Sequence, residues 1–204
     1  MTTDNVARNG LVLLGCGKMG SAMLAGWLKR GLPPQSVWVI DPKPSDWLQS
    51  TGVTLNGDLP KQPAIVLIAV KPQMMGDALP AIAAMGGGKT LFVSVAAGTP
   101  ISAFEAALGD DSPIIRAMPN TPAAVGRGIT AIIGNAHATP AHLDTAEELL
   151  TVADGLSRLV GRVGRTAPTP APVTPTRDVA EPTSRPDGAD GTDDAVRHDV
   201  LSGV

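Results

Sequence analysis

Short apolar runs alternate with stretches of helical periodicity from residue 11 to about residue 157. Six runs bounded by turn residues are predicted to be strands, at residues 11–14, 37–40, 64–69, 90–94, 114–116 and 130–133. The first four lack polar alternation over most of their length. Such runs are typical of strands that are covered on both faces of a parallel sheet.

Helices are predicted between these strands, at about residues 18–30, 44–50, 73–84, 100–108 and 140–154. The last one opens on Thr139-Pro140, a capping residue followed by proline at the first helical position. The alternation of strands and helices indicates an α/β fold, with a doubly wound, mostly parallel sheet and right-handed crossovers.

The pattern changes near residue 161. Residues 161–204 contain many prolines and acidic residues, and Leu201 is their only Leu, Ile, Met, Phe or Trp. Such a segment cannot bury enough apolar surface to offset the entropy lost on ordering. We therefore expect a folded domain over residues 1–160 and a disordered Pro/Asp-rich tail over residues 161–204.

A glycine-rich segment follows the first predicted strand. It reads Gly15-Cys16-Gly17-Lys18-Met19-Gly20 and fits G-x-G-x-x-G between a strand and a helix, the context that makes this pattern informative. Gly15 would permit the tight turn, Gly17 a close approach of the backbone to a pyrophosphate, and Gly20 close packing of helix on strand. The sequence thus predicts a Rossmann-type domain that binds NADP or NAD at this helix N-terminus. An ordinary glycine-rich turn is the alternative.

Cys16 and Asp41, two residues at this loop, each have more than one chemical interpretation. Cys16 could be a reactive thiol, because a helix N-terminus lowers a thiol pKa, but we favour a small residue at a variable position. Asp41 ends the second strand, 21 residues after Gly20, where an acid commonly binds the adenosine ribose and favours NAD. Lys43 could instead attract the 2′-phosphate of NADP, and Asp41 could simply be a cap or turn residue.

Composition narrows the function classes. Aromatic residues make up 2% of the chain and the formal net charge is −3, which argues against nucleic-acid and membrane partners. The single cysteine excludes an internal disulfide and a cysteine-rich metal site. The three histidines, His137, His142 and His198, have no metal-ligand spacing and are interpreted as surface residues. No signal peptide or membrane span is recognised, so we expect a cytoplasmic protein with no bound metal.

Three further motifs suggest a family. They are Ala69-Val70-Lys71-Pro72-Gln73, Val93-Ser94-Val95-Ala96-Ala97-Gly98, and Arg116-Ala117-Met118-Pro119-Asn120-Thr121-Pro122. Together with the glycine loop they closely resemble the N-terminal domain of pyrroline-5-carboxylate reductase over about residues 11–155. The resemblance implies NAD(P)H-dependent reduction of 1-pyrroline-5-carboxylate to L-proline, in proline biosynthesis.

The resemblance also implies a set of cofactor-binding positions. The pyrophosphate loop would be formed by Leu14, Gly15, Cys16, Gly17, Lys18 and Met19. Asn56 would reach the adenine-side ribose. The nicotinamide side would be lined by Ala69, Val70, Lys71 and Pro72, with Ser94, Ala96 and Asn120 nearby.

The same positions have structural explanations. Lys71 could be a solvated lysine, Ser94 and Ala96 could serve close helix–strand packing, and Asn120 could belong to a rigid turn. No acid–base pair is evident, and the catalytic residues stay unassigned. Hydride transfer to an iminium, which is already electrophilic, mainly needs the two rings oriented and water excluded.

The chain departs from the family after about Val152. Family members continue into a helical dimerisation domain with a Ser-Gly-Ser-Gly-Pro-Ala-Tyr motif, and are homo-oligomers. A shifted reading frame is one hypothesis for the tail, because suitable codons for residues 170–176 read Gly-Ser-Gly-His-Ala-Tyr in another frame. A native Pro-rich tail is the alternative, and sequencing the gene across residues 150–180 would decide.

The departure bears on activity. Without that domain the substrate pocket would lack a wall, so we expect weak or absent reduction of 1-pyrroline-5-carboxylate. A non-catalytic dinucleotide-binding module and a related imine or hydroxyacid reductase are the alternatives.

Overall fold

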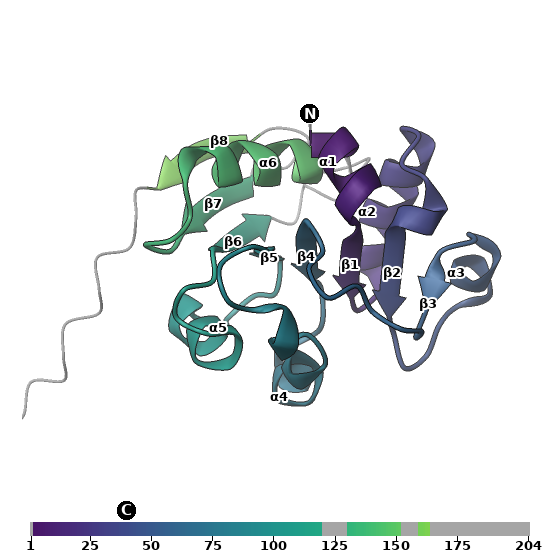
Figure 1. Cartoon of the computed structure of the whole chain (residues 1–204), viewed down its shortest axis with the longest axis horizontal. Coiled ribbons are helices and arrows are strands. Elements are labelled where there is room, and N and C mark those ends of the chain that lie inside the picture. Colours follow the sequence, from purple (N-terminus) through teal and green to yellow (C-terminus); the bar gives the residue numbers. More distant parts are fainter. Residues whose placement is uncertain (1, 120–129, 152–158, 164–204) are drawn as a thin grey trace, which may run out of the picture. The chain divides into compact units, whose positions relative to one another are not determined.

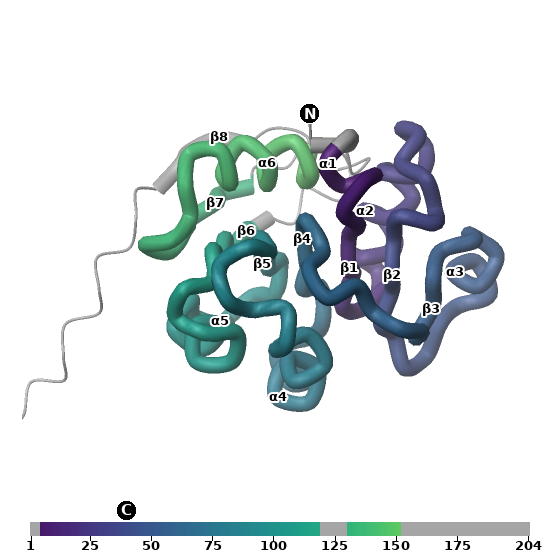
Figure 2. The backbone as a smooth tube through the Cα atoms, viewed as in Figure 1, coloured from purple at the N-terminus to yellow at the C-terminus, as the bar shows by residue number. Residues whose placement is uncertain are grey.

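The structure is a computed structural model that describes residues 2–119, 130–151 and 159–163 (Figure 2). The chain divides into two units, residues 1–169 and 170–204, and every described residue belongs to the first. The expected tail beyond residue 163, and with it the hypothesis of a shifted reading frame, lies outside the described residues.

The described strands form one sheet in the order β3-β2-β1-β4-β5-β6-β7-β8. Neighbouring strands are parallel except for β6 and β7, which are antiparallel. The chain order reverses at β1, which lies between β2 and β4. The predicted doubly wound, mostly parallel α/β fold is confirmed. The strands are β1 Leu11–Leu14, β2 Val37–Ile40, β3 Thr54–Leu55, β4 Ile65–Ile68, β5 Leu91–Ser94, β6 Ile114–Pro119, β7 Thr130–Gly134 and β8 Leu159–Val163.

Helices cover both faces of the sheet. They are α1 Thr2–Asn9, α2 Lys18–Lys29, α3 Asp46–Ser50, α4 Met75–Ala78, α5 Ile101–Leu108 and α6 Pro140–Thr151. Buried residues of α2 and α6 share one core with one face of the sheet, and buried residues of α4 and α5 share a second core with the other face. Figure 1 accordingly shows α1 and α6 on one side of the strands and α4 and α5 on the other.

One hydrogen bond joins the two helices on the first face. The indole Nε1 of Trp27 in α2 donates to the backbone carbonyl of Leu149 in α6 at 2.9 Å, and the indole is buried. A buried indole N–H is satisfied in this way without water. The contact ties the first crossover helix to a helix more than a hundred residues later in the chain.

The prediction of one continuous helix at residues 73–84 is wrong. The segment contains a 3-10 turn at Pro72–Met74, then α4, and then two more 3-10 turns at Leu79–Ala81 and Ala83–Met85. Pro80 lies in the middle of it. Proline has no N–H to donate, and its ring clashes with the carbonyl of the preceding helical turn, so the helix is interrupted here.

The first helix was not expected, because residues 1–10 are mostly polar. Val6 supplies its buried contact and is 2% exposed. Gly10 ends the helix with φ of +90°, and its N–H donates to the carbonyl of Val6 at 2.7 Å. A glycine in left-handed backbone is a common way to end a helix, and here it leads directly into β1.

Most predicted boundaries agree with the structure to within one or two residues, and β6 and β8 differ more. β8 reaches Val163, three residues into the segment expected to be tail, and β6 extends to Pro119 rather than to residue 116. α6 starts at Pro140 as predicted, and the hydroxyl Oγ1 of Thr139 accepts from the N–H of His142 at 3.3 Å, as an N-cap does. His137 is exposed and His142 is partly exposed.

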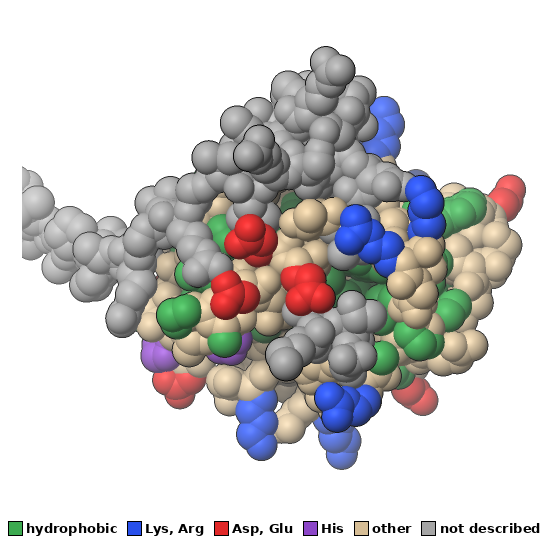
Figure 3. All heavy atoms as spheres, turned by 90° about the horizontal axis from the view of Figure 1, so that it is seen from above, with side chains coloured by type: hydrophobic (Ala, Val, Ile, Leu, Met, Phe, Trp, Pro, Cys, Tyr) green, Lys and Arg blue, Asp and Glu red, His purple; other side chains and the backbone are tan. Residues whose placement is uncertain are grey.

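The described surface carries charges of both signs. Figure 3 shows a group of acidic side chains near the centre of the face seen from above, with Lys or Arg side chains toward its upper right and along its lower edge. Within the described ranges, no helix has the length and apolar character needed to cross a bilayer.

Candidate functional site

The glycine loop lies where the strand order reverses, at the carboxyl ends of β1, β2 and β4. Gly15 has φ of +87°, and a Cβ there would lie 2.7 Å from the Val70 side chain. Its N–H donates to the carbonyl of Ile40 at 2.8 Å, while the N–H of Ala69 donates to the carbonyl of Leu14 at 2.8 Å. Residue 15 must therefore be glycine for both conformational and steric reasons. Open α/β sheets bind ligands at such a point.

The N-terminus of α2 faces open space. Gly17 is its N-cap, no side chain caps the helix, and the first turn contains no acidic residue. Both Gly17 and Lys18 are exposed, and a Cβ at Gly17 would meet nothing within 4 Å. The first N–H groups of a helix have no intrahelical partner and carry partial positive charge. This end of α2 can therefore receive an anion such as a pyrophosphate.

Gly20 brings α2 close to the loop. A Cβ at this position would lie 2.4 Å from the carbonyl oxygen of Gly15, closer than any real contact. Gly20 is buried, and Met19 beside it packs against the core. The predicted role of Gly20 in close packing of the helix is confirmed.

Asp41 holds the glycine loop from the end of β2. Its Oδ2 accepts from the N–H of Cys16 at 2.8 Å, and its Oδ1 accepts from the N–H of Lys43 at 2.8 Å. Asn56 fixes the Asp41 backbone in turn, accepting from its N–H at 2.9 Å and donating to its carbonyl at 2.8 Å. Asn56 has φ of +49°, a conformation that asparagine tolerates better than most residues. These bonds place a carboxylate beside the loop with both oxygens engaged.

The thiol of Cys16 is held in its neutral form. Burial raises its pKa from the ordinary 9.0 to about 11, and the Asp41 carboxylate adds to the rise. A thiolate is the reactive form of cysteine. The structure therefore favours the interpretation of Cys16 as a small, unreactive residue of the loop.

We expect iodoacetamide to alkylate Cys16 slowly. At pH 8, a thiol with a pKa of about 11 is thiolate about 100-fold less often than one with the ordinary value of 9.0. The alkylation rate of the native protein should be lower by about that factor than the rate in urea, followed by mass spectrometry. Cys16 is the only cysteine, so the same chain unfolded is its own control. Equal rates in the two states would contradict the burial argument.

A small apolar cavity adjoins the loop. It measures about 320 Å³ and lies between the ends of β1, β2 and β4 and the segment after β4. Its lining residues are Leu14, Ile40, Pro42, Asn56, Val70, Met74, Asp77, Ala78 and Ala81. Apolar walls with a few polar groups suit a flat heterocycle such as adenine. Leu14, Asn56 and Val70 were predicted from the sequence.

Six residues of this lining were missed. Ile40 and Pro42 lie at and just after the end of β2. The other four, Met74, Asp77, Ala78 and Ala81, lie in the segment that the sequence predicted as one continuous helix. Their spacing reads as an ordinary core-facing helix, so no signal in the sequence marks them as cavity residues.

The strand ends beyond the loop carry the remaining predicted residues. After β4, Ala69 is partly buried, while Lys71 and Pro72 are exposed. Ser94, the last residue of β5, and Ala96 just beyond it are 1% and 6% exposed, and the Ser94 hydroxyl accepts from the N–H of Ala96 at 3.2 Å. Ala96 belongs to the core on the α4–α5 face. Both residues thus serve packing, and their place beside a nicotinamide stays a prediction.

The structure describes β6 as far as its last residue, Pro119, so Asn120 lies outside the described residues. Arg116 pairs in register with Ser94, and its Nε is buried without a hydrogen-bond partner among the described residues. This guanidinium near the carboxyl edge of the sheet was not singled out from the sequence as a site residue.

Known proteins are similar to this chain in sequence. Residues 10–98 match the protein family described as NADP oxidoreductase coenzyme F420-dependent. The pyrroline-5-carboxylate reductase of Escherichia coli is 38% identical over 143 residues, which are 67% of this chain and 52% of that protein. The chain therefore spans about half the length of the curated relatives that it matches.

Two solved structures share the fold. A pyrroline-5-carboxylate reductase from Coxiella burnetii has a TM-score of 0.65 at 23% identity, over 78% of this chain and 59% of that one. The Plasmodium falciparum pyrroline carboxylate reductase with NADP bound has a TM-score of 0.62 at 23% identity, over 76% and 59%. Over its N-terminal domain, this chain is related to the pyrroline-5-carboxylate reductases.

Proposed function

We propose that the described domain binds NADH or NADPH across the carboxyl edge of its sheet. One observation carries this proposal, namely the uncapped N-terminus of α2, where Gly17 faces open space and Gly20 leaves no room for a side chain. The pyrophosphate would accept from the N–H groups of Lys18 and Met19. The adenine would occupy the apolar cavity lined by Leu14 and Val70.

The proposed activity is reduction of 1-pyrroline-5-carboxylate to L-proline. It is supported by the sequence relation to enzymes of that name and by a structural neighbour with NADP bound. A bound nicotinamide would supply the hydride, and the iminium carbon would accept it without a strong acid catalyst. The residues of this chain would contribute binding and orientation: the loop holds the pyrophosphate, and Asp41 and Asn56 hold the loop.

The activity is tested by mixing the whole chain with 1-pyrroline-5-carboxylate and reduced cofactor. We expect imine-dependent loss of absorbance at ~340 nm and an equal amount of proline, measured by mass spectrometry. The Gly17→Val variant, which should no longer place the pyrophosphate, is the control for a contaminating reductase. Cofactor binding without imine-dependent oxidation would contradict the reductase proposal while leaving the binding proposal intact.

The second candidate is a dinucleotide-binding module without catalysis. It requires only the glycine loop and the apolar cavity described above. The assay above separates the two candidates. A panel of other cyclic imines and 2-keto acids in the same assay separates pyrroline-5-carboxylate from a related reductase substrate.

We expect NADH to bind about 10-fold more tightly than NADPH. Asp41 is held beside the loop by Cys16 and Lys43, so its carboxylate cannot turn away from an adenosine ribose that binds there. A carboxylate can accept hydrogen bonds from the ribose hydroxyls of NADH, and it repels the 2′-phosphate of NADPH. A repulsion of about 1.4 kcal/mol corresponds to a difference of about 10-fold in affinity. Fluorescence titrations with the two reduced cofactors measure the ratio.

Asp41→Asn keeps an acceptor oxygen for the loop and removes the charge. In this variant the preference for NADH should fall toward unity. Asp111→Asn removes an equal charge from an exposed position after α5 and should leave the ratio unchanged. A wild-type preference for NADPH would mean that Lys43 outweighs Asp41.

Two expectations about the protein in the cell stay predictions, namely a cytoplasmic location and a small-molecule partner rather than nucleic acid or a membrane.

A further inference from the structure

The N-terminus of α6 is closed by a pair of reciprocal hydrogen bonds. The backbone N–H of Thr139 donates to the imidazole Nδ1 of His142 at 3.2 Å, and the N–H of His142 donates to the Thr139 hydroxyl at 3.3 Å. The carbonyl of Thr139 accepts from the N–H of Leu143 at 3.1 Å, as the first bond of the helix. This is the geometry of a capping box, in which glutamate or glutamine usually accepts from the N-cap. Here a histidine supplies that acceptor.

Apolar contacts hold the same turn of α6. Ala138, just before the cap, is buried in the core on this face of the sheet, and Leu143 packs against that core. A Cβ at Gly134 would lie 2.5 Å from the Cβ of Ala138 and 3.7 Å from the Cδ2 of Leu143, so the glycine at the end of β7 makes room for both. Such a pair around a cap is a hydrophobic staple. The staple does not titrate, whereas an imidazole does.

The capping box requires a neutral imidazole. A neutral ring that accepts at Nδ1 carries its proton on Nε2. Burial lowers the pKa of His142 below 6.5, against a smaller rise from a hydrogen bond to the backbone of His137, so the ring is neutral at pH 7. A second proton would occupy Nδ1 and remove the acceptor for the N–H of Thr139. It would also place a positive charge in the first turn of a helix, where the macrodipole disfavours it.

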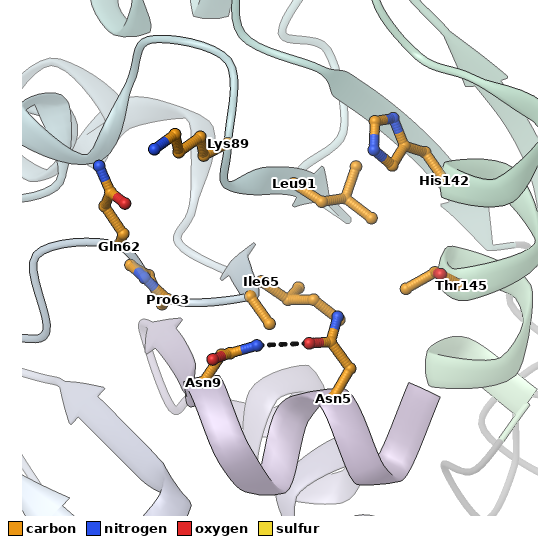
Figure 4. A pocket seen from close by; sticks show the side chains of 10 residues that line it. Asn5, Asn9, Gln62, Pro63, Ile65, Lys89, Leu91, His142 and Thr145 are labelled. Atoms are coloured by element: carbon orange, nitrogen blue, oxygen red, sulfur yellow. Dashed lines mark hydrogen bonds between the residues drawn. The ribbon is translucent and has the colours of Figure 1, made fainter. Parts of the chain in front are cut away.

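A hollow of about 330 Å³ lies in front of the imidazole, between α6 and α1 (Figure 4). Figure 4 shows Asn5 and Asn9 of α1 on its other side, and neither carries a charge. Lys89, just before β5, is the one charged residue besides His142 in the described lining. A positive charge disfavours a second cation nearby. The hollow therefore opposes protonation of the imidazole and offers no carboxylate that would favour it.

The other elements around this turn bring three charged side chains. Glu105 of α5 accepts from the Nδ2 of Asn135 at 3.0 Å, and the Oδ1 of Asn135 accepts from the N–H of His137 at 3.2 Å. Asp144 lies on α6 itself and Arg8 on α1, and neither lines the hollow. Glu105 thus acts on the turn before the cap, through an amide.

We propose that the Thr139–His142 capping box is a pH-sensitive switch, which opens the first turn of α6 when the imidazole takes up a proton. As the pH falls, the unfolded chain takes up this proton before the folded chain does. The stability that the box contributes is therefore complete above pH 6.5 and is lost as the pH falls from there through the folded pKa. The far end of α6 stays bound to α2 through Trp27 and Leu149, so we expect the opening to be confined to the first turn.

The test is nuclear magnetic resonance of the whole isotope-labelled chain between about pH 8 and about pH 5. At the upper pH, proton–nitrogen spectra of the ring should show the Nε2–H tautomer of His142. The amide proton of Thr139 should shift with the same midpoint as the ring, below 6.5. The protection of the Leu143 amide against exchange, relative to an unstructured peptide at the same pH, should fall about 5-fold or more, as loss of one hydrogen bond predicts.

His142→Gln is the deciding variant, because glutamine can accept from the N-cap in the same way and does not titrate. It should stay folded by circular dichroism, and its Thr139 shift and Leu143 protection should not change over this pH range. His137→Gln is the matched control, since that side chain is exposed and only its backbone contacts the ring. It should behave like the unmodified chain.

Three results would overturn the proposal. They are the Nδ1–H tautomer of His142 at the upper pH, a Thr139 amide that does not follow the ring, and an equal loss of Leu143 protection in His142→Gln. None of them depends on the proposed cofactor function, because the capping box shares no residue with the glycine loop or the adenine cavity.

Discussion

Replacing Gly17 with valine should lower the affinity for NADH at least about 100-fold while the protein stays folded. The backbone of Gly17 is extended, at φ −70° and ψ −159°, and a Cβ there meets no protein atom within 4 Å. Valine is therefore accepted by the fold, but its branched side chain occupies the space in front of the α2 N-terminus. Loss of two charge-assisted hydrogen bonds to a pyrophosphate costs about 3 kcal/mol or more, which corresponds to that factor.

Fluorescence titration with NADH measures this loss, and circular dichroism of the same samples checks the fold. Gly76→Ala is the matched control, because Gly76 in α4 also has open space around a Cβ and lies outside the loop. Its affinity for NADH should equal that of the unmodified chain. A Gly17→Val protein that binds NADH normally would place the cofactor somewhere other than this loop.

Replacing Gly20 with alanine should destabilise the domain by about 1–3 kcal/mol. Helix propensity alone favours alanine over glycine by about 1 kcal/mol. At this position the added Cβ would lie 2.4 Å from the carbonyl oxygen of Gly15, and backbone cannot rotate away as a flexible side chain can. Overpacking of this kind costs about 1–3 kcal/mol and sometimes more, beyond any gain in propensity. Because Gly15 turns the loop, the strain falls on the candidate site itself.

Urea unfolding followed by circular dichroism measures the change in the free energy of unfolding. Gly76→Ala again serves as the comparison, and there the expected change is near zero or slightly stabilising. If Gly20→Ala matched Gly76→Ala in stability, the close approach of α2 to β1 would be refuted.

The sheet was largely predictable because its strands are short, buried and nearly all apolar. β1, β4 and β5 are buried at every position, and apart from Ser94 at the end of β5 each reads as an uninterrupted apolar run. β3 escaped prediction because it has two residues and only half-buried side chains. α1 escaped because Val6 is the one core contact among those of its side chains that the structure describes, residues 5–9, and one contact gives almost no periodicity to detect.

The site was predictable where backbone constraints demand particular residues. Gly15 and Gly20 are required by left-handed backbone and by close contact, and both requirements are visible in the sequence pattern. The engagement of both Asp41 oxygens depends on how the loop and the turn after β2 meet in space. No local sequence pattern indicates such a contact between distant segments. The neutral state of Cys16 likewise depends on burial, which overrides the helix N-terminus that the sequence suggested.

Binding of a dinucleotide at the glycine loop is tested most directly by titrating the whole chain with NADH and then adding ADP-ribose. We predict saturable binding with one cofactor per chain, displaced competitively by ADP-ribose, because that molecule retains the adenine and the pyrophosphate. Folded protein that takes up neither NADH nor NADPH would contradict the account.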